Sequence, residues 1–198
     1  MSKVVITIGR EFGSRGREIG IKLGEKLKIP VYDKDIIKIG AWNDGMLDEK
    51  YIEMDSGIDD RLYGYDTGKY PLESGDADSL FRLQARTIKR LAENHSCIFI
   101  GRCADYVLEG MENCINVFIY APYSERYYYL LDKYGLTEEE TKKMITKVDK
   151  DRHTYYKHIT GHNRGERNKK QLEIDSSYFG VEGTVNIILA AVENVMQK

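Results

Sequence analysis

The residues best suited to chemistry in this sequence form a short segment rich in glycine and arginine near its start. Gly13 and Gly16 allow the backbone to curl closely around an anion. Ser14, Arg15 and Arg17 add hydrogen-bond donors and positive charge. Where such a loop leads into a helix, consecutive backbone N–H groups and the helix dipole also favour an anion. The segment therefore predicts a loop that binds phosphate groups.

The flanking residues predict the strand and the helix that this loop requires. Val4–Ile8 is a β-branched run typical of a buried strand, and the spacing of Ile19, Leu23 and Leu27 is typical of one face of a helix. The loop departs from the usual motif G-x-x-x-x-G-K-S/T, because neither the lysine nor the hydroxyl residue occupies its end. An ordinary buried strand that enters a glycine-containing turn is the alternative interpretation.

Composition places the chain among globular proteins with nearly balanced charge. Its 198 residues suffice for one large domain, and hydrophobic residues make up 41% of them. With 30 basic and 32 acidic residues, nothing in the overall charge suggests a nucleic-acid polymer or a membrane as partner. The three cysteines suggest free thiols in a reducing compartment. Because we see neither a signal peptide nor an apolar run of about 20 residues, we expect a cytoplasmic protein.

Strand and helix patterns alternate along the chain, which predicts a parallel sheet. Apolar or β-branched runs indicate four further strands, at residues 29–33, 97–101, 114–121 and 172–177. With the first strand they predict an α/β fold, a three-layer α/β/α sandwich with a five-stranded parallel sheet. Ligands of such sheets bind beyond the carboxyl ends of the strands, where Asp33 and Arg102 follow two of the predicted strands.

Two stretches differ from this alternation. Residues 43–78 carry many glycines, acids and tyrosines and are too long for a plain connection, so we expect an irregular insertion there. The predicted helix 137–156 carries Lys147, Lys150 and Arg152, and the polar segment that follows it is strongly basic as far as residue 170. Taken alone, such a charge run is usually a solvated surface.

Several short motifs, by their order and spacing, resemble the cytidylate kinase-like branch of the nucleoside monophosphate kinases. The motifs are Ile6-Thr7-Ile8, Gly13-Ser14-Arg15-Gly16-Arg17-Glu18, Tyr32-Asp33-Lys34-Asp35, Phe99-Ile100-Gly101-Arg102, Asp149-Lys150-Asp151-Arg152 with Tyr155-Tyr156, and Ile174-Asp175-Ser176-Ser177. The resemblance covers about residues 4–189 and implies a single domain of the P-loop nucleoside triphosphate hydrolase type. Its parts would be a core (1–42, 79–146 and 171–198), an acceptor-binding insertion (about 43–78) and a lid (about 147–170).

The resemblance also implies roles for individual residues, with ATP and Mg²⁺ as cofactors. Residues 13–18 would cradle the ATP phosphates, and Glu18 would lie near the magnesium ion. The acceptor-site residues would be Asp33, Lys38, Arg102 and Asp105. The lid cations would be Lys147, Lys150 and Arg152. The catalytic cations would be Arg17, Arg102 and Arg152.

Three positions depart from the family's pattern. Without a gap in the alignment, Gly16 occupies the position of the family's phosphate-loop lysine; with one extra loop residue, Arg17 does. We expect Arg17 to replace that lysine, and Arg15 is its rival. Glu18 stands where the family has a hydroxyl residue that helps to hold magnesium. Cys103 stands where the family's Gly-Arg-Asp element has its acid, with Asp105 as a possible substitute.

Phosphoryl transfer asks a protein mainly to align two phosphates and to neutralise charge on the transferred group. The leading hypothesis is therefore an ATP-dependent kinase that converts a nucleoside monophosphate, CMP or dCMP, to the diphosphate. ATP and the monophosphate would be its partners, and the oligomeric state stays open. Two alternatives remain, because fold and loop do not identify an acceptor. One is a P-loop kinase for another small molecule, and the other is a catalytically weak nucleotide-binding regulatory module.

Overall fold

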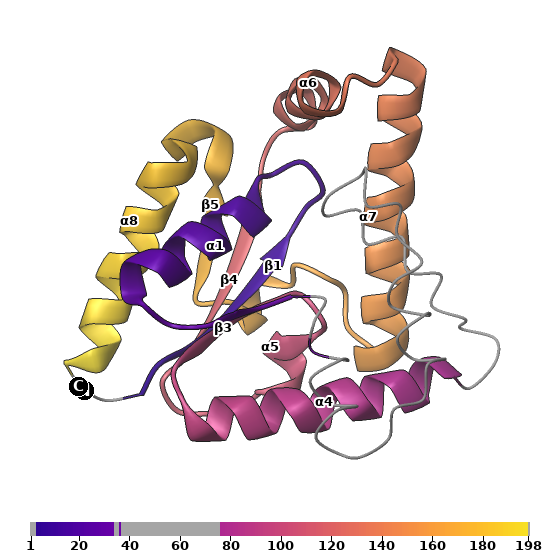
Figure 1. The fold of residues 1–198 in the computed structure, drawn as a ribbon. Helices are drawn as coiled ribbons and strands as arrows, with labels where there is room; N and C mark the ends of the chain where they lie inside the picture. The colour runs from indigo at the N-terminus through magenta and orange to yellow at the C-terminus, as the bar shows by residue number, and fades with distance from the viewer. Residues whose placement is uncertain (1–2, 34–35, 37–75, 198) are drawn as a thin grey trace.

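The computed structural model describes residues 3–33, 36 and 76–197, which contain a central parallel sheet (Figure 1). The predicted insertion, apart from its last three residues, lies outside the described residues, as does Lys38. The strands are β1 (Val5–Arg10), β2 (Val31–Tyr32), β3 (Cys97–Ile100), β4 (Cys114–Tyr120) and β5 (Leu172–Asp175). Their order across the sheet is β2-β3-β1-β4-β5, and every pair is parallel. The predicted five-stranded parallel sheet is confirmed.

β1 lies at the centre of the sheet because its residues are apolar on both faces. Val5, Ile6 and Ile8 are almost completely buried. In the register of the sheet, Ile8 pairs with Ile100 on one side and with Val117 on the other. Since neighbouring strands run in the same direction, the segments that follow β1 and β3 emerge at the same edge of the sheet.

Helices cover both faces of the sheet (Figure 1). The helices on the described part of the chain are α1 (Gly16–Leu27), α4 (Asp76–Asn94), α5 (Ala104–Val107), α6 (Tyr123–Tyr134), α7 (Glu138–Thr160) and α8 (Ser176–Met196), with a short 3₁₀ helix, η1 (Arg167–Lys169). Ile19 and Leu23 of α1 and Val185 and Ile188 of α8 form the core on one face. Ile88 of α4 belongs to the core on the opposite face, which α5 also joins. The predicted three-layer sandwich is confirmed.

α7 begins and ends at clear sequence signals. The side chain of Thr137 accepts a hydrogen bond from the N–H of Glu140, whose carboxylate accepts one from the N–H of Thr137, and this forms a capping box. Gly161, with φ of 74°, ends the helix in the left-handed conformation. α7 therefore runs four residues beyond its predicted end at Tyr156, without a break through the first part of the segment assigned to the lid.

α8 alone among the helices of the described residues is long and apolar enough to cross a membrane, by length and composition only. The sequence pattern had indicated no such segment. In the structure, Val181, Val185, Ile188 and Val192 of α8 are buried against the sheet and α1. α8 thus packs one of its faces against the rest of the domain, as an amphipathic surface helix does.

Candidate active site

The phosphate loop, residues 11–15, lies between β1 and α1 at the carboxyl edge of the sheet (Figure 1). α1 begins at Gly16; the residue before it, Arg15, adopts the left-handed conformation (φ 59°), and no side chain caps the helix there. By contrast, Thr137 caps α7 and Asp175 caps α8. Within the described residues, the first N–H groups of α1 therefore lack a side-chain cap, and an anion would be a favourable partner for them.

Close packing also requires glycine at the two glycine positions of this region, in addition to the predicted approach of a phosphate. A Cβ at Gly13 would lie 2.8 Å from Cδ1 of Leu130 and 3.0 Å from Cβ of Arg126, both on α6, and Gly13 has φ of +82°. A Cβ at Gly16 would lie 2.6 Å from Cβ of Arg10. The loop is thus held closely between α6 and the end of β1, where a larger residue would displace a neighbour.

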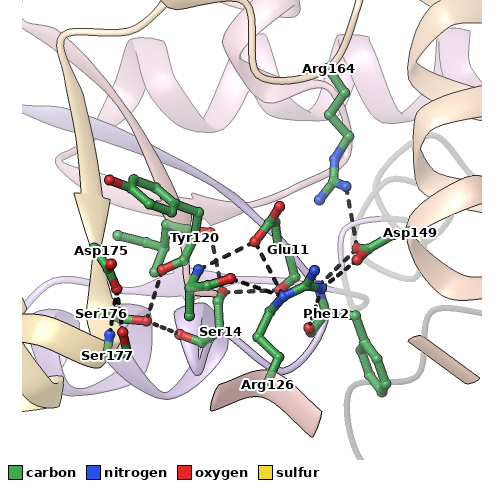
Figure 2. Close-up of polar contacts among 12 residues, drawn as sticks. Glu11, Phe12, Ser14, Tyr120, Arg126, Asp149, Arg164, Asp175, Ser176 and Ser177 are labelled. Carbon is green, nitrogen blue, oxygen red and sulfur yellow. Dashed lines mark hydrogen bonds and ion pairs between the residues drawn. The ribbon is translucent and has the colours of Figure 1, made fainter. Parts of the chain in front are cut away.

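Ser14 faces the interior of the protein. Its side chain is buried, and its Oγ donates to the carbonyl oxygens of Glu11 (3.0 Å) and Ile119 (3.1 Å). The carbonyl oxygen of Ser14 accepts a hydrogen bond from Oγ of Ser176 at 2.7 Å (Figure 2). In this structure the hydroxyl, which the sequence suggested as a phosphate donor, ties the loop to the neighbouring strand instead.

The charged side chains at the end of the loop form two sets of ion pairs. Arg15 binds Glu18 through Nε–Oε2 (3.0 Å) and Nη2–Oε1 (2.9 Å). These hydrogen bonds raise the pKa of Arg15 and lower the pKa of the Glu18 carboxyl. Arg17 instead donates from Nε to Oδ2 of Asp33 (2.8 Å), and Oδ1 of Asp33 lies 3.8 Å from Nη2 of Arg10. The structure therefore brings Arg17 to the end of the second strand.

A cavity of about 610 Å³ lies beside the phosphate loop, between α1 and α6. Its size falls within the range of about 300–1,000 Å³ that is typical of small-molecule sites. Tyr129 and Tyr134 of α6 form part of its wall. Six basic side chains line it: Arg10, Arg15, Arg17, Lys22, Lys133 and Arg152. Three carboxylates, of Glu11, Glu18 and Glu25, also line it, so the cavity has an excess of positive charge.

A second, smaller cavity of about 50 Å³ lies beyond the ends of β1 and β3. Its basic lining residues are Arg10, Arg102, Arg152, Arg164 and Lys170. Arg10 and Arg152 line both cavities. Arg152 is only 9% exposed, and its guanidinium carbon lies 5.6 Å from the centre of the Phe12 ring. Arg152 thus lies where the two cavities adjoin, in contact with the phosphate loop.

Burial and like charge distinguish the small cavity electrostatically. Burial lowers the pKa of Arg164 to about 10, and the nearby Arg10 contributes in the same direction. The acidic lining residue, Asp105, accepts a hydrogen bond from Oη of Tyr156 (3.0 Å) and forms an ion pair with Lys170. Burial, with the charge of Asp105, also raises the pKa of Tyr156. Arginines gathered in such a place favour an anionic ligand.

The structure also places the remaining residues that the sequence singled out. Arg102 is buried at the end of β3 with φ of 61°, and it lines the small cavity. Lys147 is exposed and donates from Nζ to Oδ2 of Asp151 (2.9 Å). Lys150 is exposed as well, and neither lysine lines the cavities described above. Lys38 lies outside the described residues.

Four residues at the site were not singled out from the sequence for specific roles. Arg10 directly follows the apolar run of β1, at the edge where ligands bind, and that position was a usable signal. Asp149 lies one helical turn before Arg152, so both lie on one face of α7. Arg164 belongs to the basic segment, whose composition alone indicated a solvated surface. Arg126 carried no comparable signal, because its importance depends on long-range packing.

The chain is similar to a known protein family and to several solved structures. The sequence matches the model of the cytidylate kinase-like family over residues 5–178, whereas no curated protein matches it. A solved structure of an uncharacterized protein from Eubacterium ventriosum is similar, with 23% identity, a TM-score of 0.71, and coverage of 96% of this chain and 99% of that chain.

Two kinases of known structure share the fold. Shikimate kinase from Bacteroides thetaiotaomicron is 17% identical, with a TM-score of 0.55 and coverage of 97% of this chain and 99% of that one. A gluconokinase from Sinorhizobium meliloti is 14% identical, with a TM-score of 0.53 and coverage of 98% and 95%. The predicted P-loop fold is confirmed by these likenesses. Since the family model spans most of the sequence, the chain belongs to the cytidylate kinase-like family.

Proposed function

We propose that the protein is an ATP-dependent kinase that phosphorylates a nucleoside monophosphate, CMP or dCMP, to the diphosphate. The observation that carries this proposal is the pair of adjoining cavities that share Arg10 and Arg152. One is built on the phosphate loop and the other on buried cations, so two phosphate-bearing molecules could meet between them. The family and the fold support the coarser assignment, a small-molecule kinase of the P-loop type.

The larger cavity suits the triphosphate of ATP. The uncapped start of α1 offers backbone N–H groups to an anion, and Arg15 and Lys22 add charge nearby. Glu18 is the carboxylate that we propose for magnesium, and it would exchange Arg15 for the ion or for one of its waters. Magnesium, when bound there, would offset the negative charge of the phosphates. The described residues contain no cluster of three potential metal ligands.

The smaller cavity suits the acceptor's phosphate. At about 50 Å³ it accommodates little more than a phosphate-sized group, so the nucleoside would extend beyond it. We propose that Arg102 and Arg164 bind the acceptor phosphate and that Arg152 contacts the group in transfer. Asp33, which forms ion pairs with Arg10 and Arg17, would line the acceptor site beside the phosphate loop. Burial of these cations would exclude water, which strengthens their attraction for phosphate and protects against hydrolysis.

The acceptor is tested by ADP release from ATP and magnesium across all ribo- and deoxyribonucleoside monophosphates. We expect turnover with CMP or dCMP to exceed that with the other monophosphates, and we expect none with an acceptor that lacks the phosphate. Cytidine serves as the matched control, because it has the same base and sugar without the phosphate. Shikimate and gluconate belong in the same panel, because kinases with this fold act on such small molecules. Turnover of either of these alone would replace the nucleotide assignment, and tight ATP binding without any turnover would favour a regulatory module.

Arg102→Ala is expected to raise the KM for the acceptor about thirtyfold, because a charge-assisted contact to phosphate contributes roughly 2 kcal/mol. kcat should fall as well, since the same contact aligns the acceptor. Arg102 already has φ of 61°, so alanine introduces no new departure from the usual backbone conformation. Steady-state kinetics with each substrate varied in turn would measure both changes. Arg82→Ala, at an exposed position on α4, is the matched control. Unchanged kinetics in a folded Arg102 variant would remove that residue from the site.

A further inference from the structure

The side chain of Asp149 on α7 binds the backbone of the phosphate loop. Its Oδ1 accepts a hydrogen bond from the N–H of Phe12 (2.9 Å), across 137 positions of the sequence. We infer that Asp149 is a positioning residue that keeps the loop in its anion-binding shape and couples it to the cationic acceptor cavity. This inference rests on the proposed function and adds to it a link between the two substrate sites.

Arg126 of α6 binds the same loop residue, Phe12, and also binds Asp149 (Figure 2). Its Nη1 donates to Oδ2 of Asp149 (2.5 Å) and to the carbonyl oxygen of Phe12 (3.0 Å). Its Nε donates to the carbonyl oxygen of Ala121 (3.1 Å) and lies 3.3 Å from Oε2 of Glu11. Both backbone polar groups of Phe12 are therefore bound by one ion pair, in which Arg126 is buried and Asp149 is partly exposed. Removing one partner of such a pair would leave the other partly desolvated and unpaired, so the contact specifies the position of the loop.

Arg164 connects this ion pair to the acceptor cavity. Its Nη1 lies 3.8 Å from Oδ1 of Asp149, the same oxygen that binds the N–H of Phe12 (Figure 2). Its guanidinium also lines the small cavity, near Arg10, and rests over the ring of Phe118 at 5.6 Å. An anion in that cavity would attract Arg164 and thereby weaken the interaction of Arg164 with Asp149. The carboxylate of Asp149 thus contacts both the phosphate loop, through Phe12, and the lining of the small cavity, through Arg164.

The contacts predict the sign of the coupling. In the structure, Oδ1 of Asp149 accepts from the N–H of Phe12 and also lies near the cation of Arg164. When a phosphate takes up the charge of Arg164, Asp149 can bind Phe12 and Arg126 more strongly, so the loop is better ordered for the donor. We therefore expect an anion in the acceptor cavity to raise the affinity for the donor nucleotide, and the reverse by reciprocity.

The test compares Asp149→Asn and Asp149→Ala with the control Asp151→Asn on the same helix, where Asp151 pairs with the exposed Lys147. Affinity for a non-hydrolysable ATP analogue is titrated with and without inorganic phosphate, which stands in for the acceptor phosphate. In the unaltered protein and the control, phosphate should raise the analogue's affinity about fivefold or more. In Asp149→Asn this factor should fall to about one. The asparagine oxygen can still accept from Phe12, but its amide cannot pair with Arg126.

Hydrogen exchange at residues 11–15 provides a second readout that needs neither substrate nor activity. The amide of Phe12 should exchange at least about tenfold faster in Asp149→Ala than in the control, and at an intermediate rate in Asp149→Asn. Thermal unfolding of each variant identifies general loss of structure. Unchanged exchange at Phe12, or full coupling in a folded Asp149→Asn, would overturn the inference. If the unaltered protein binds no ATP analogue while exchange at Phe12 responds as expected, the proposed function fails. The inference that Asp149 positions the loop would then still be supported.

Discussion

Arg152→Ala is expected to lower kcat about a thousandfold, while the affinity for ATP changes little. An arginine that contacts the phosphoryl group in transfer contributes about 10³–10⁵ in rate in related chemistry, because it stabilises charge that develops only in the transition state. Arg152 is placed for this role: it is buried, it lies over Phe12 of the phosphate loop, and it lines both cavities. Single-turnover rates at saturating ATP and acceptor would measure the effect directly.

Lys143→Ala is the control for this experiment, because Lys143 is an exposed cation on the same helix that pairs with Glu139 in the first turn. It should leave turnover unchanged. Arg152→Lys should recover only part of the rate, since a point charge lacks the planar fork that can bind two phosphate oxygens. If Arg152→Ala instead raises the KM for ATP and leaves kcat intact, the residue binds the ground state only, and a different cation must act on the transferred group.

Arg17→Ala is expected to lower turnover about a hundredfold, which corresponds to roughly 3 kcal/mol of transition-state stabilisation. We propose that Arg17 leaves Asp33 when ATP is present and takes the place of the missing phosphate-loop lysine. The ion pair of Arg17 is partly exposed, so the exchange of one anionic partner for another costs little. The protein should fold normally, because a cation at a helix start is slightly unfavourable to the helix dipole. Turnover and thermal unfolding are the measurements.

Arg15→Ala is the natural comparison, since Arg15 lies two residues earlier and is paired with Glu18. It should lose much less activity than Arg17→Ala. The opposite ranking would mean that the loop contains no extra residue relative to the family, and that Arg15 reaches the phosphates once Glu18 binds magnesium. Full activity in both variants would show that neither arginine substitutes for the lysine.

The sequence was sufficient for the architecture because the fold depends on local patterns that repeat along the chain. The β-branched run at the start and the apolar runs near 97–101 and 114–121 became β1, β3 and β4, since strands buried on both faces are apolar throughout. The convergence of Asp33 with the loop also followed from topology, as the ion pair with Arg17 demonstrates. Parallel strands leave little choice about where their carboxyl ends meet.

Side-chain direction could not be predicted in the same way. Ser14 reads as a phosphate donor in sequence, yet its hydroxyl points inward because β4 presents a carbonyl group there. Arg126 and Asp149 are 23 positions apart and far from the loop in sequence, so nothing local indicated that they would enclose Phe12. The basic segment was equally ambiguous: its composition is typical of a surface, whereas the side chain of Arg164 is largely buried, near Arg10. Such contacts depend on how α6 and α7 pack, which periodicity does not specify.

The unbroken course of α7 has a mechanical consequence. A helix of 23 residues is about 35 Å long and stiff, so it moves as one rigid body. Near its middle, Met144 and Val148 pack with Phe12, and toward its far end Tyr155 and Tyr156 pack with Cys103, next to Arg102. Glycines in the left-handed conformation lie on either side of the helix, Gly135 before it and Gly161 after it. Under the proposed function, a small tilt of α7 caused by one substrate would therefore also move the contacts of α7 near the other substrate, without any bending of the helix.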